Sequence, residues 1–460
     1  MCLGYDDDMK IKLPENVKTI LDTMHSAGFE AYVVGGCVRD CVLGRKPQDW
    51  DITTNALPEE TKKLFKRTID TGIEHGTVTI MIGKEGYEVT TYRIDGKYED
   101  SRHPSEVTFT KNLTEDMKRR DFTINAMAYN EEEGLIDRFG GLDDIESKVI
   151  RCVGNPKERF SEDALRIMRA VRFSAQLDYE IEESTREAVK ELAQNLSKIS
   201  AERIQTELVK LVTSDHPEKL KTAYELGVTK VILPEFDKCM ETAQNNPHHM
   251  YNVGDHIISS MENIRADKVL RLTMLMHDIA KPATITVDDD GVCHFKGHSE
   301  LGVQMAHSIF RRLKFDRDTM DRACNLIRYH DDRFPATPKA VRRAMNRVGV
   351  DEFPYLMEVR YADTMAQSMY YREEKLQLIE DTKKVYEEIL AKKDCVTLKD
   401  LAVNGKDLIS LGVTPGKKIG EILSAMLDDV LDNPEHNSKE YLLEPERLKK
   451  TFLMDQINEG

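Results

Sequence analysis

Residues 32–54 read YVVGGCVRDCVLGRKPQDWDITT, and this stretch decides which fold we expect. Its first residues are apolar and β-prone. Gly35-Gly36 then interrupts them before a short amphipathic turn that ends at Gly44. Asp49 and Asp51 flank Trp50, and because side chains alternate along a strand, both carboxylates should share one face, about 6–7 Å apart. Two such carboxylates repel each other unless a cation lies between them.

These parts favour one kind of chemistry. Mg²⁺ takes few carboxylate ligands and keeps room for phosphate oxygens. A Gly-Gly turn that opens a helix offers backbone N–H groups to a phosphate. Together they indicate metal-assisted phosphoryl or nucleotidyl transfer. Either part alone is most often an ordinary loop, so the prediction depends on the whole ordered string.

That string, GG-x-VRD-x-x-LGR-x-x-x-DxD, closely resembles the signature of class II tRNA nucleotidyltransferases and bacterial poly(A) polymerases, within the polymerase β superfamily. The resemblance implies an α/β catalytic head with a nucleotidyltransferase palm. It also implies Mg²⁺ at Asp49 and Asp51. Nucleotide contacts are implied for the glycine turn and the residues after it, Gly35, Gly36, Arg39 and Asp40.

A third carboxylate is expected from a neighbouring strand. The runs TVTIMI (77–82) and YEVTTYRI (87–94) are separated by Gly83-Lys84-Glu85-Gly86, which predicts a hairpin. A polymerase β palm takes its third carboxylate from a strand beside the DxD strand, and Glu88 is the candidate. An ordinary exposed strand glutamate is the equal alternative.

Two further motifs resemble those of the family. In KRRDFTINA (118–126), Asp121 is a helix-start signal, and the basic pair before it could reach phosphates or a ribose. RRDFTINA is similar to the second family motif, which senses the ribose, and IDRFGG (136–141) to the third, which hinges head and neck. The resemblance implies nucleotide contacts at Arg119, Arg120, Asp121 and Asn125.

The stretch EDALRIMRAVRF (162–173) predicts a helix on which Asp163 and Arg166 share a face. Such a pair is commonly a surface ion pair, but a carboxylate beside a guanidinium can also imitate a Watson–Crick edge. The family motif E-D-x-x-R selects CTP and ATP in this way, and ISAERIQTEL (199–208) resembles the motif that braces the neck. The implied nucleotide-binding residues are Glu162, Asp163, Arg166, Arg169 and Arg172.

Residues 92–110 are polar and predict a loop. They resemble the flexible loop that class II enzymes need to switch from adding C to adding A. The loop has no shortening of the kind seen in enzymes restricted to CC addition.

A second possible metal site follows the order H…HD…D. His277-Asp278 is expected on an apolar helix, with His256 upstream and Asp363 downstream. The order resembles the HD superfamily of metal-dependent phosphohydrolases, in which His298 and His330 would match extra ligands. The resemblance implies a second divalent metal (Mn, Ni or Fe). The alternative is that each histidine caps a helix or pairs with a carboxylate.

Composition sets the outer limits. The chain has 460 residues and a net charge of −16, which argues against a generally basic RNA-coating protein. We expect no membrane span and no signal peptide, because no run of 18 apolar residues exists and the N-terminus is acidic. Eight scattered cysteines without a CxxC pair favour reduced thiols in a cytoplasm.

The pattern becomes almost wholly helical after about residue 156. We therefore expect an α/β head at 1–150, a helical neck at 151–245, an HD domain at 246–370 and a helical body and tail at 371–460 that binds tRNA. The resemblance implies two-metal addition of C, C and A to the tRNA 3′ end from CTP and ATP, with pyrophosphate released. A poly(A) polymerase, an enzyme restricted to A or CC, and an HD-type phosphohydrolase or phosphodiesterase stay open.

Overall fold

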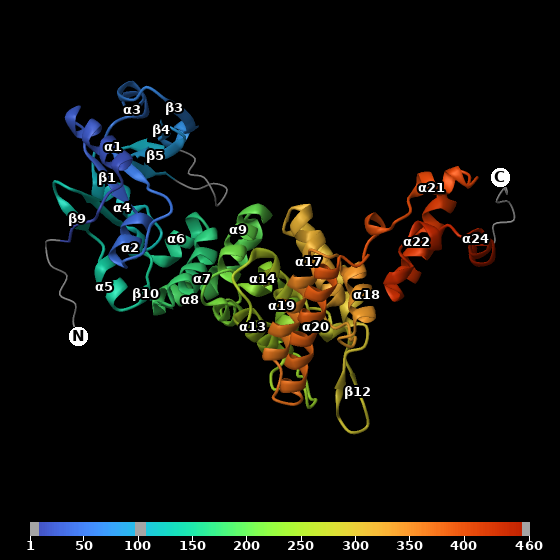
Figure 1. Ribbon diagram of the computed structural model, residues 1–460. Helices are drawn as coiled ribbons and strands as arrows, with labels where there is room; N and C mark the ends of the chain where they lie inside the picture. The colour runs from blue at the N-terminus through green and yellow to red at the C-terminus, as the bar shows by residue number, and fades with distance from the viewer. Residues whose placement is uncertain (1–8, 97–106, 453–460) are drawn as a thin grey trace. The chain divides into compact units, whose positions relative to one another are not determined.

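The computed structural model describes residues 9–96 and 107–452 (Figure 1). The chain forms two compact units, Met1–Pro234 and Glu235–Gly460. The first contains a mixed sheet with helices, and the second is almost entirely helical. The expected α/β head followed by a helical remainder is therefore confirmed.

The head is built on one seven-stranded sheet in the order β3-β4-β5-β2-β1-β8-β9. Buried apolar residues on both strands and helices pack against it, among them Tyr32, Val34 and Met117. The strands are β1 (Ala31–Val34), β2 (Ile52–Thr54), β3 (Thr68–Gly72), β4 (Thr77–Ile82), β5 (Glu85–Thr91), β8 (Met127–Asn130) and β9 (Gly134–Asp137). The helices of this part are α1 (Glu15–Ser26), α2 (Gly36–Val42), α3 (Pro58–Leu64), α4 (Leu113–Lys118) and α5 (Gly141–Glu146).

The strand pairing puts the candidate carboxylates next to each other. β4 and β5 form the expected antiparallel hairpin. β5 also pairs in parallel with β2, with Ile52 opposite Val89. Continuing this register by one residue toward the N-terminus brings Glu88 beside Asp51. The sequence prediction that Glu88 comes from the strand beside the DxD segment is thus confirmed.

The position of the two aspartates within a strand is wrong in detail. β2 begins only at Ile52, so Asp49 and Asp51 lie in the segment that enters it. The backbone is nevertheless held there, because the Val34 N–H donates to the Asp51 carbonyl at 2.9 Å. Strand alternation therefore does not determine how the two carboxylates point.

The polar stretch 92–110 is not a loop throughout. Its ends form a two-stranded antiparallel ribbon, β6 (Arg93–Asp95) with β7 (Val107–Phe109). Residues 97–106, the middle of the expected switching loop, lie outside the described residues, so that prediction stays a prediction.

Two predicted helices are divided differently in the structure. No helix begins at Asp121, because α4 ends at Lys118 and only a single 3₁₀ turn, η2 (Thr123–Asn125), follows. The expected helix across 162–173 is interrupted as well. α6 (Pro156–Glu162) ends, Asp163 is extended with φ −139° and ψ 104°, and α7 (Leu165–Leu177) begins.

The rest of the first unit is a set of short helices after two paired strands, β10 (Val149–Ile150) and β11 (Glu180–Ile181). α7 packs against α9, which carries the motif expected to brace the neck. The helices are α8 (Glu183–Leu192), α9 (Ala201–Val212), α10 (Leu220–Glu225) and α11 (Thr229–Ile232).

In the second unit, helices surround the expected second metal site. α14 (Lys268–Met276) ends one residue before His277, so His277-Asp278 lies in the turn after that helix and not on it. His256 lies on α13 (Val253–Glu262) and Asp363 on α19 (Phe353–Met365). The other elements are α12 (Pro234–Met240), α15 (Lys281–Thr284), β12 (Thr286–Val287), β13 (Cys293–His294), α16 (His298–Arg312), α17 (Arg317–Tyr329), α18 (Pro338–Val348) and α20 (Arg372–Lys392).

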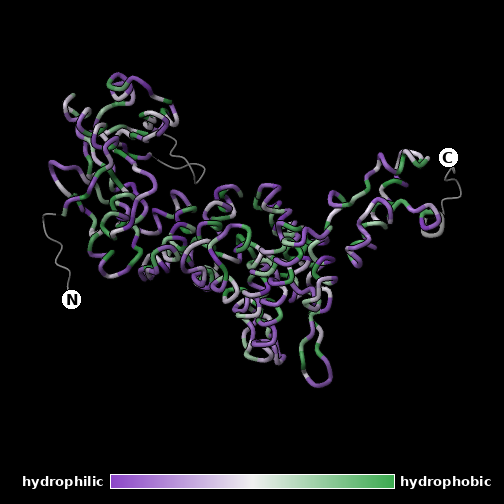
Figure 2. Tube along the Cα trace, in the orientation of Figure 1, coloured by the Kyte–Doolittle hydropathy of each residue, from purple (hydrophilic) through white to green (hydrophobic). Residues whose placement is uncertain are grey.

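The C-terminal helices have a core of their own, in which Leu408, Met426 and Leu431 are buried together. They are α21 (Gly405–Ser410), α22 (Lys417–Asp432), α23 (Lys439–Leu442) and α24 (Pro445–Phe452). Hydrophilic and hydrophobic residues alternate along the helices of both units, as expected where one helix face is buried (Figure 2). Among the described residues, every helix is too short or too polar to cross a membrane.

Candidate functional site

The head carboxylates, Asp49, Asp51 and Glu88, are all exposed and lie within electrostatic reach of one another. Desolvation by the surrounding chain raises the pKa of Glu88, and the charges of Asp51 and Asp49 raise it further. Desolvation also raises the pKa of Asp51, which Asp49 adds to and Arg120 opposes. Three like charges held close together are the donor set that a hard divalent cation prefers.

The head carboxylates do not form a tight ligand cluster. In the described part of the chain, the groups of three or more possible ligands within 4.8 Å of one another lie elsewhere. One of them, Asp178 with His216 and Glu218, is exposed or half-buried and lies outside any motif. Mutual repulsion opposes a closer approach of the head carboxylates, and a cation would relieve it. The residues present therefore fit a divalent metal by their chemistry.

Arg120 lies between these carboxylates and the glycine turn. Its Nη2 is 3.5 Å from the buried Asp116 carboxylate, and Asp51 also attracts its charge. Gly35 has φ +84°, and a Cβ there would come within 3.4 Å of Arg120 Nη1. The close approach and the positive φ both favour glycine at this position.

The glycine turn is less open than the sequence suggested. The Gly35 N–H donates to the Met127 carbonyl at 3.1 Å, so it is not free for a phosphate. Gly36 begins α2 and lies next to Arg39. Only the helix start after Gly35 keeps the expected role.

Asp116 is a residue that the sequence analysis missed. It is fully buried and accepts hydrogen bonds from Arg119 Nε at 3.0 Å and from Thr53 Oγ1 at 3.0 Å. It thereby ties the basic pair Arg119-Arg120 to strand β2. An i, i+3 and i, i+4 relation to these arginines was the available signal, but it looked like ordinary helix-surface pairing.

A second network joins the predicted ribose motif to α7. Asp121 accepts from Arg169 Nε at 2.7 Å, and Asn125 accepts from Arg39 Nη1 at 2.7 Å. Arg39 also donates to its neighbour Asp40. Burial opposes ionisation of Asp121, but Arg169 lowers its pKa to about 2. Four predicted site residues on α2, after α4 and on α7 are thus brought together.

Phe173 collects three of the predicted arginines around its ring. The guanidinium carbons of Arg172, Arg39 and Arg169 lie 3.9, 5.1 and 5.3 Å from its centroid. Glu207 on α9, missed in the sequence, accepts from Arg172 Nε at 2.5 Å and is itself buried. Arg172 is therefore a packed bridge between α7 and α9 more than an open nucleotide contact.

The expected plate of Asp163 and Arg166 is differently paired. Asp163 accepts from Arg203 at 2.7 and 3.3 Å and caps Leu165 N–H at 3.0 Å. Arg166 pairs with Glu162 at 2.7 Å. The shared helix face predicted for Asp163 and Arg166 is wrong, because the chain breaks between the two helices. Arg203 is a third partner that spacing along the chain could not reveal.

We predict that Asp121→Asn destabilises the first unit by about 3–5 kcal/mol at neutral pH, because Arg169 loses its buried counter-charge. The folded pKa of Asp121, about 2, lies below its ordinary value of 3.8. The stabilisation is therefore present above pH about 4 and is lost as pH falls through about 2. Denaturant unfolding followed by Trp50, the single tryptophan, measures it.

Glu225→Gln is the matched control, because it breaks an exposed ion pair with Arg186 at 3.4 Å. Such a surface pair contributes roughly 0–1 kcal/mol. Equal losses for the two variants would show that the Asp121–Arg169 pair is an ordinary surface contact.

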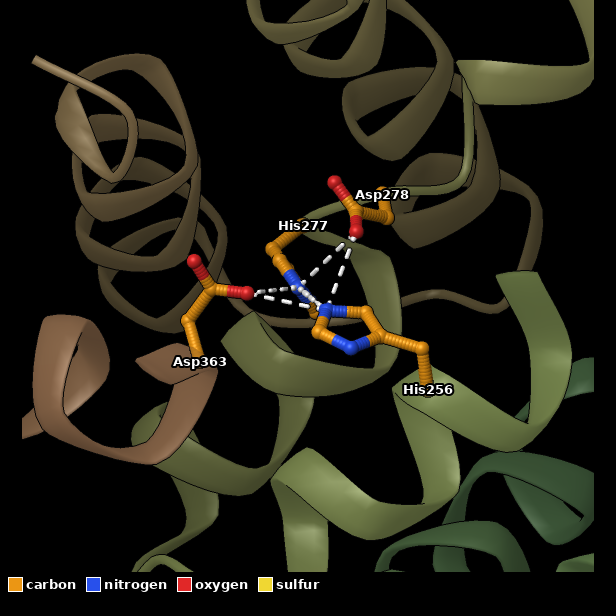
Figure 3. Close-up of side chains that lie close together, drawn as sticks. All are labelled: His256, His277, Asp278 and Asp363. Atoms are coloured by element: carbon orange, nitrogen blue, oxygen red, sulfur yellow. Dashed lines mark hydrogen bonds and ion pairs between the residues drawn. The ribbon is translucent and has the colours of Figure 1, made fainter. Parts of the chain in front are cut away.

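The second candidate centre is the His/Asp group, formed by His256, His277, Asp278 and Asp363 (Figure 3). His256 Nε2 lies 2.9 Å from Asp363 Oδ1, 3.2 Å from Asp278 Oδ2 and 3.2 Å from His277 Nε2. Both histidines and Asp278 are almost completely buried. The structure therefore brings together all four residues that the H…HD…D order predicted.

The ring orientations in this group are those of metal ligands. His256 Nδ1 is 3.2 Å from the Ala366 carbonyl, and His277 Nδ1 is 2.6 Å from the Met274 carbonyl. A carbonyl can only accept, so each Nδ1 carries a proton and each Nε2 faces the group. Burial disfavours charge on His277, but Asp278 raises its pKa to about 10. Two facing ring nitrogens between two carboxylates call for a cation.

Asp278 also faces a second group with His298 and His330. Its Oδ1 lies 3.4 and 3.6 Å from the Nε2 atoms of these two histidines, whose Nδ1 atoms again bond backbone carbonyls. Its Oδ2 accepts from Lys281 Nζ at 2.8 Å. Lys281 was missed in the sequence, although its i, i+3 spacing from Asp278 was visible.

Both groups border a cavity of about 1120 Å³ in the second unit. Five cationic side chains line it, which favours an anionic ligand. They are Lys281, Lys296, Arg333, Arg360 and Lys375.

Comparison with known proteins identifies the family. The chain matches the "Poly A polymerase head domain" at residues 31–151. It also matches the "Probable RNA and SrmB- binding site of polymerase A" at 178–240 and "tRNA nucleotidyltransferase domain 2" at 298–445.

Individual relatives carry one name. The chain is similar to CCA-adding enzymes of Lactobacillus helveticus, 52% identical over 208 residues, and Streptococcus suis, 55% identical over 196 residues. These alignments cover 45% and 43% of this chain and 52% and 49% of the relatives, so the chain spans about half the length of the curated relatives it matches.

A solved structure extends the likeness to nearly the whole chain. The Bacillus stearothermophilus CCA-adding enzyme in complex with CTP is 30% identical, with a TM-score of 0.73. The likeness covers 96% of this chain and 100% of that one. The chain belongs to the family of class II CCA-adding enzymes and bacterial poly(A) polymerases.

Proposed function

We propose that this protein is a CCA-adding tRNA nucleotidyltransferase that adds C, C and A to the 3′ end of tRNA from CTP and ATP. The observation that carries the proposal is the parallel pairing of β5 with β2, which brings Glu88 beside Asp51. The family and the CTP complex of the Bacillus stearothermophilus relative support it.

In the proposed reaction, the tRNA 3′-hydroxyl attacks the α-phosphate of the nucleotide, and pyrophosphate leaves. Asp49 and Asp51, with Glu88 beside them, would hold Mg²⁺ in the two-metal arrangement of this family. When bound, Mg²⁺ lowers the pKa of the attacking hydroxyl and neutralises the developing charge. Arg120 and Arg119, held by Asp116, are placed to bind the triphosphate.

The neck residues position the nucleotide in this proposal. Asp121 and Asn125 are fixed by Arg169 and Arg39 and would face the ribose. Asp163 and Arg166 would read the base edge by hydrogen bonds. Regions 1–150, 151–245, 246–370 and 371–460 stay our proposed head, neck, HD and tRNA-binding parts. The seven described cysteines are free thiols, which supports a reducing cytoplasm as the proposed compartment.

Single-nucleotide extension tests the proposal against its alternatives. We would give the enzyme three tRNAs that lack all, two or one of the terminal residues, with CTP or ATP alone. A CCA-adding enzyme uses CTP on the first two and ATP only on the third. Repeated A addition to any tRNA would instead identify a poly(A) polymerase. Activity with one nucleotide alone would identify an enzyme restricted to CC or A.

We expect Arg203→Ala to relax base choice, because Arg203 fixes the Asp163 carboxylate through two hydrogen bonds. An unpaired buried donor or acceptor costs roughly 1–3 kcal/mol, which corresponds to about 5- to 150-fold in selectivity. Asp163→Ala and Arg166→Ala should lose discrimination similarly. Incorporation kinetics with all four NTPs measure this, with Arg186→Ala as a control on an exposed pair. Uniform slowing with the C and A preference intact would leave the three residues a structural role.

A second activity is favoured by one specific observation. The Nε2 atoms of His256 and His277 face each other and two carboxylates, while their Nδ1 atoms are fixed by backbone carbonyls. The His/Asp group would hold a divalent metal (Mn, Ni or Fe) beside the cationic cavity. We therefore propose a metal-dependent phosphohydrolase or phosphodiesterase in the second unit. Hydrolysis of bis(p-nitrophenyl) phosphate with each metal tests it.

A further inference from the structure

Two tyrosines project from the turn between α19 and α20. Tyr370 and Tyr371 are 45% and 56% exposed, and their ring centroids lie 4.3 Å apart at 63°. Tyr371 has φ +53°, a conformation that bulky side chains rarely adopt. The turn thus holds two large rings in water at a backbone cost, which is a pattern found at functional positions.

The tyrosine pair is connected to the His/Asp group. The Tyr370 ring packs edge-on against His248, which lines the cavity, at 4.9 Å between centroids. Lys375 Nζ bonds His248 Nδ1 at 3.2 Å and Gln367 Oε1 at 2.7 Å. Gln367 Nε2 in turn donates to Asp363 Oδ2 at 3.0 Å. One continuous network therefore links the exposed rings to a carboxylate of the candidate metal centre.

The cavity next to the tyrosines is prepared for an anion. Arg360 lines it and packs over Phe334 with 5.0 Å to the ring centroid. Its Nη1 is buried and donates no hydrogen bond within the described part of the chain. An unpaired buried guanidinium nitrogen is unfavourable, and a phosphate oxygen would satisfy it. Lys375 and Lys281 add positive charge on the same lining.

We propose that this region is a binding site for the end of a single-stranded RNA. Its terminal phosphate lies against Arg360 and Lys375, and its last bases stack on Tyr370 and Tyr371. Nucleic acid is the ligand class that combines phosphates with flat aromatic faces, and exposed aromatic side chains beside cations are how proteins bind single strands. The inference rests on the proposed phosphohydrolase activity, for which it names the substrate.

Photo-crosslinking of the full chain tests the site. The probe is a six-nucleotide RNA with 4-thiouridine at its last position and a 3′-phosphate, used with Mn²⁺. We expect crosslinks to the peptide that contains Tyr370 and Tyr371. Because stacking and phosphate contacts act together, Arg360→Gln should lower this crosslink about 10-fold or more while both tyrosines remain. Arg347→Gln, which breaks an ion pair with Asp332 at 3.3 Å, should leave it unchanged.

Hydrolysis of bis(p-nitrophenyl) phosphate by the same protein separates the possible failures. Hydrolysis with crosslinks only in Met1–Pro234 would overturn the RNA site and leave the phosphohydrolase standing. Crosslinks at the tyrosines without hydrolysis would keep the RNA site and overturn the phosphohydrolase. Crosslinks that Arg360→Gln does not reduce would overturn the phosphate contact on which the site depends.

Discussion

Asp51→Ala is expected to lower nucleotide incorporation into tRNA by about 10³-fold or more, because it removes a metal ligand whose charge acts on the transition state. Asp49→Ala should have a comparable effect. The measurement is the single-turnover rate of CTP addition to tRNA that lacks its 3′ end. Both variants should fold, because both carboxylates are exposed and neither side chain is part of the core.

Asp22→Ala on α1 is the matched control, because this aspartate is also exposed in the head and lies far from any motif. It should retain the wild-type rate. Activity of Asp49→Ala and Asp51→Ala within tenfold of wild type would place the reaction elsewhere in the chain.

Asp278→Asn is expected to abolish metal binding in the second unit, because Asp278 faces both histidine groups. We predict loss of bound metal and a drop of about 10²-fold or more in hydrolysis of bis(p-nitrophenyl) phosphate. Addition of CCA should stay near the wild-type rate, since the head carboxylates lie in the other unit. Metal content by mass spectrometry and the two rates check this.

Asp321→Asn serves as the control, because Asp321 is exposed and pairs only loosely with Arg317 at 3.3 Å. It should keep its metal and both activities. Full metal content in Asp278→Asn would show that the His/Asp group is a buried ion-pair cluster without a metal.

Local patterns were enough to predict much of the head. Alternation in β4 and β5, with Gly83 between them, fixed the hairpin and thereby the strand of Glu88. The order of His256, His277, Asp278 and Asp363 likewise predicted which residues would meet, although they are distant along the chain. Strong motifs in a known order carry such long-range information, whereas composition does not.

Breaks between elements were harder to predict. Nothing in EDALRIMR is a proline or glycine, so a continuous helix was the simplest expectation at 162–173. Asp163 nevertheless ends α6 and caps Leu165, a role that short acidic side chains favour. Its partner Arg203 is 40 residues away, and only the packing of α7 on α9 brings it close.

Buried charge partners were the other omission. Asp116 and Glu207 looked like helix-surface acids, yet both are buried against arginines of the proposed nucleotide site. A single sequence shows the charge of such residues but not their burial. Their roles follow only when the positions of neighbouring elements are known.

The central claim is that the head carboxylates bind the metal that serves nucleotide addition. The most direct measurement is anomalous scattering from Mn²⁺ in crystals of the protein with CTP. We predict a peak in contact with Asp49 and Asp51 that is absent in Asp51→Ala. Crystals with CTP bound and Mn²⁺ only at the His/Asp group, from a protein that Mn²⁺ activates for nucleotide addition, would contradict the claim.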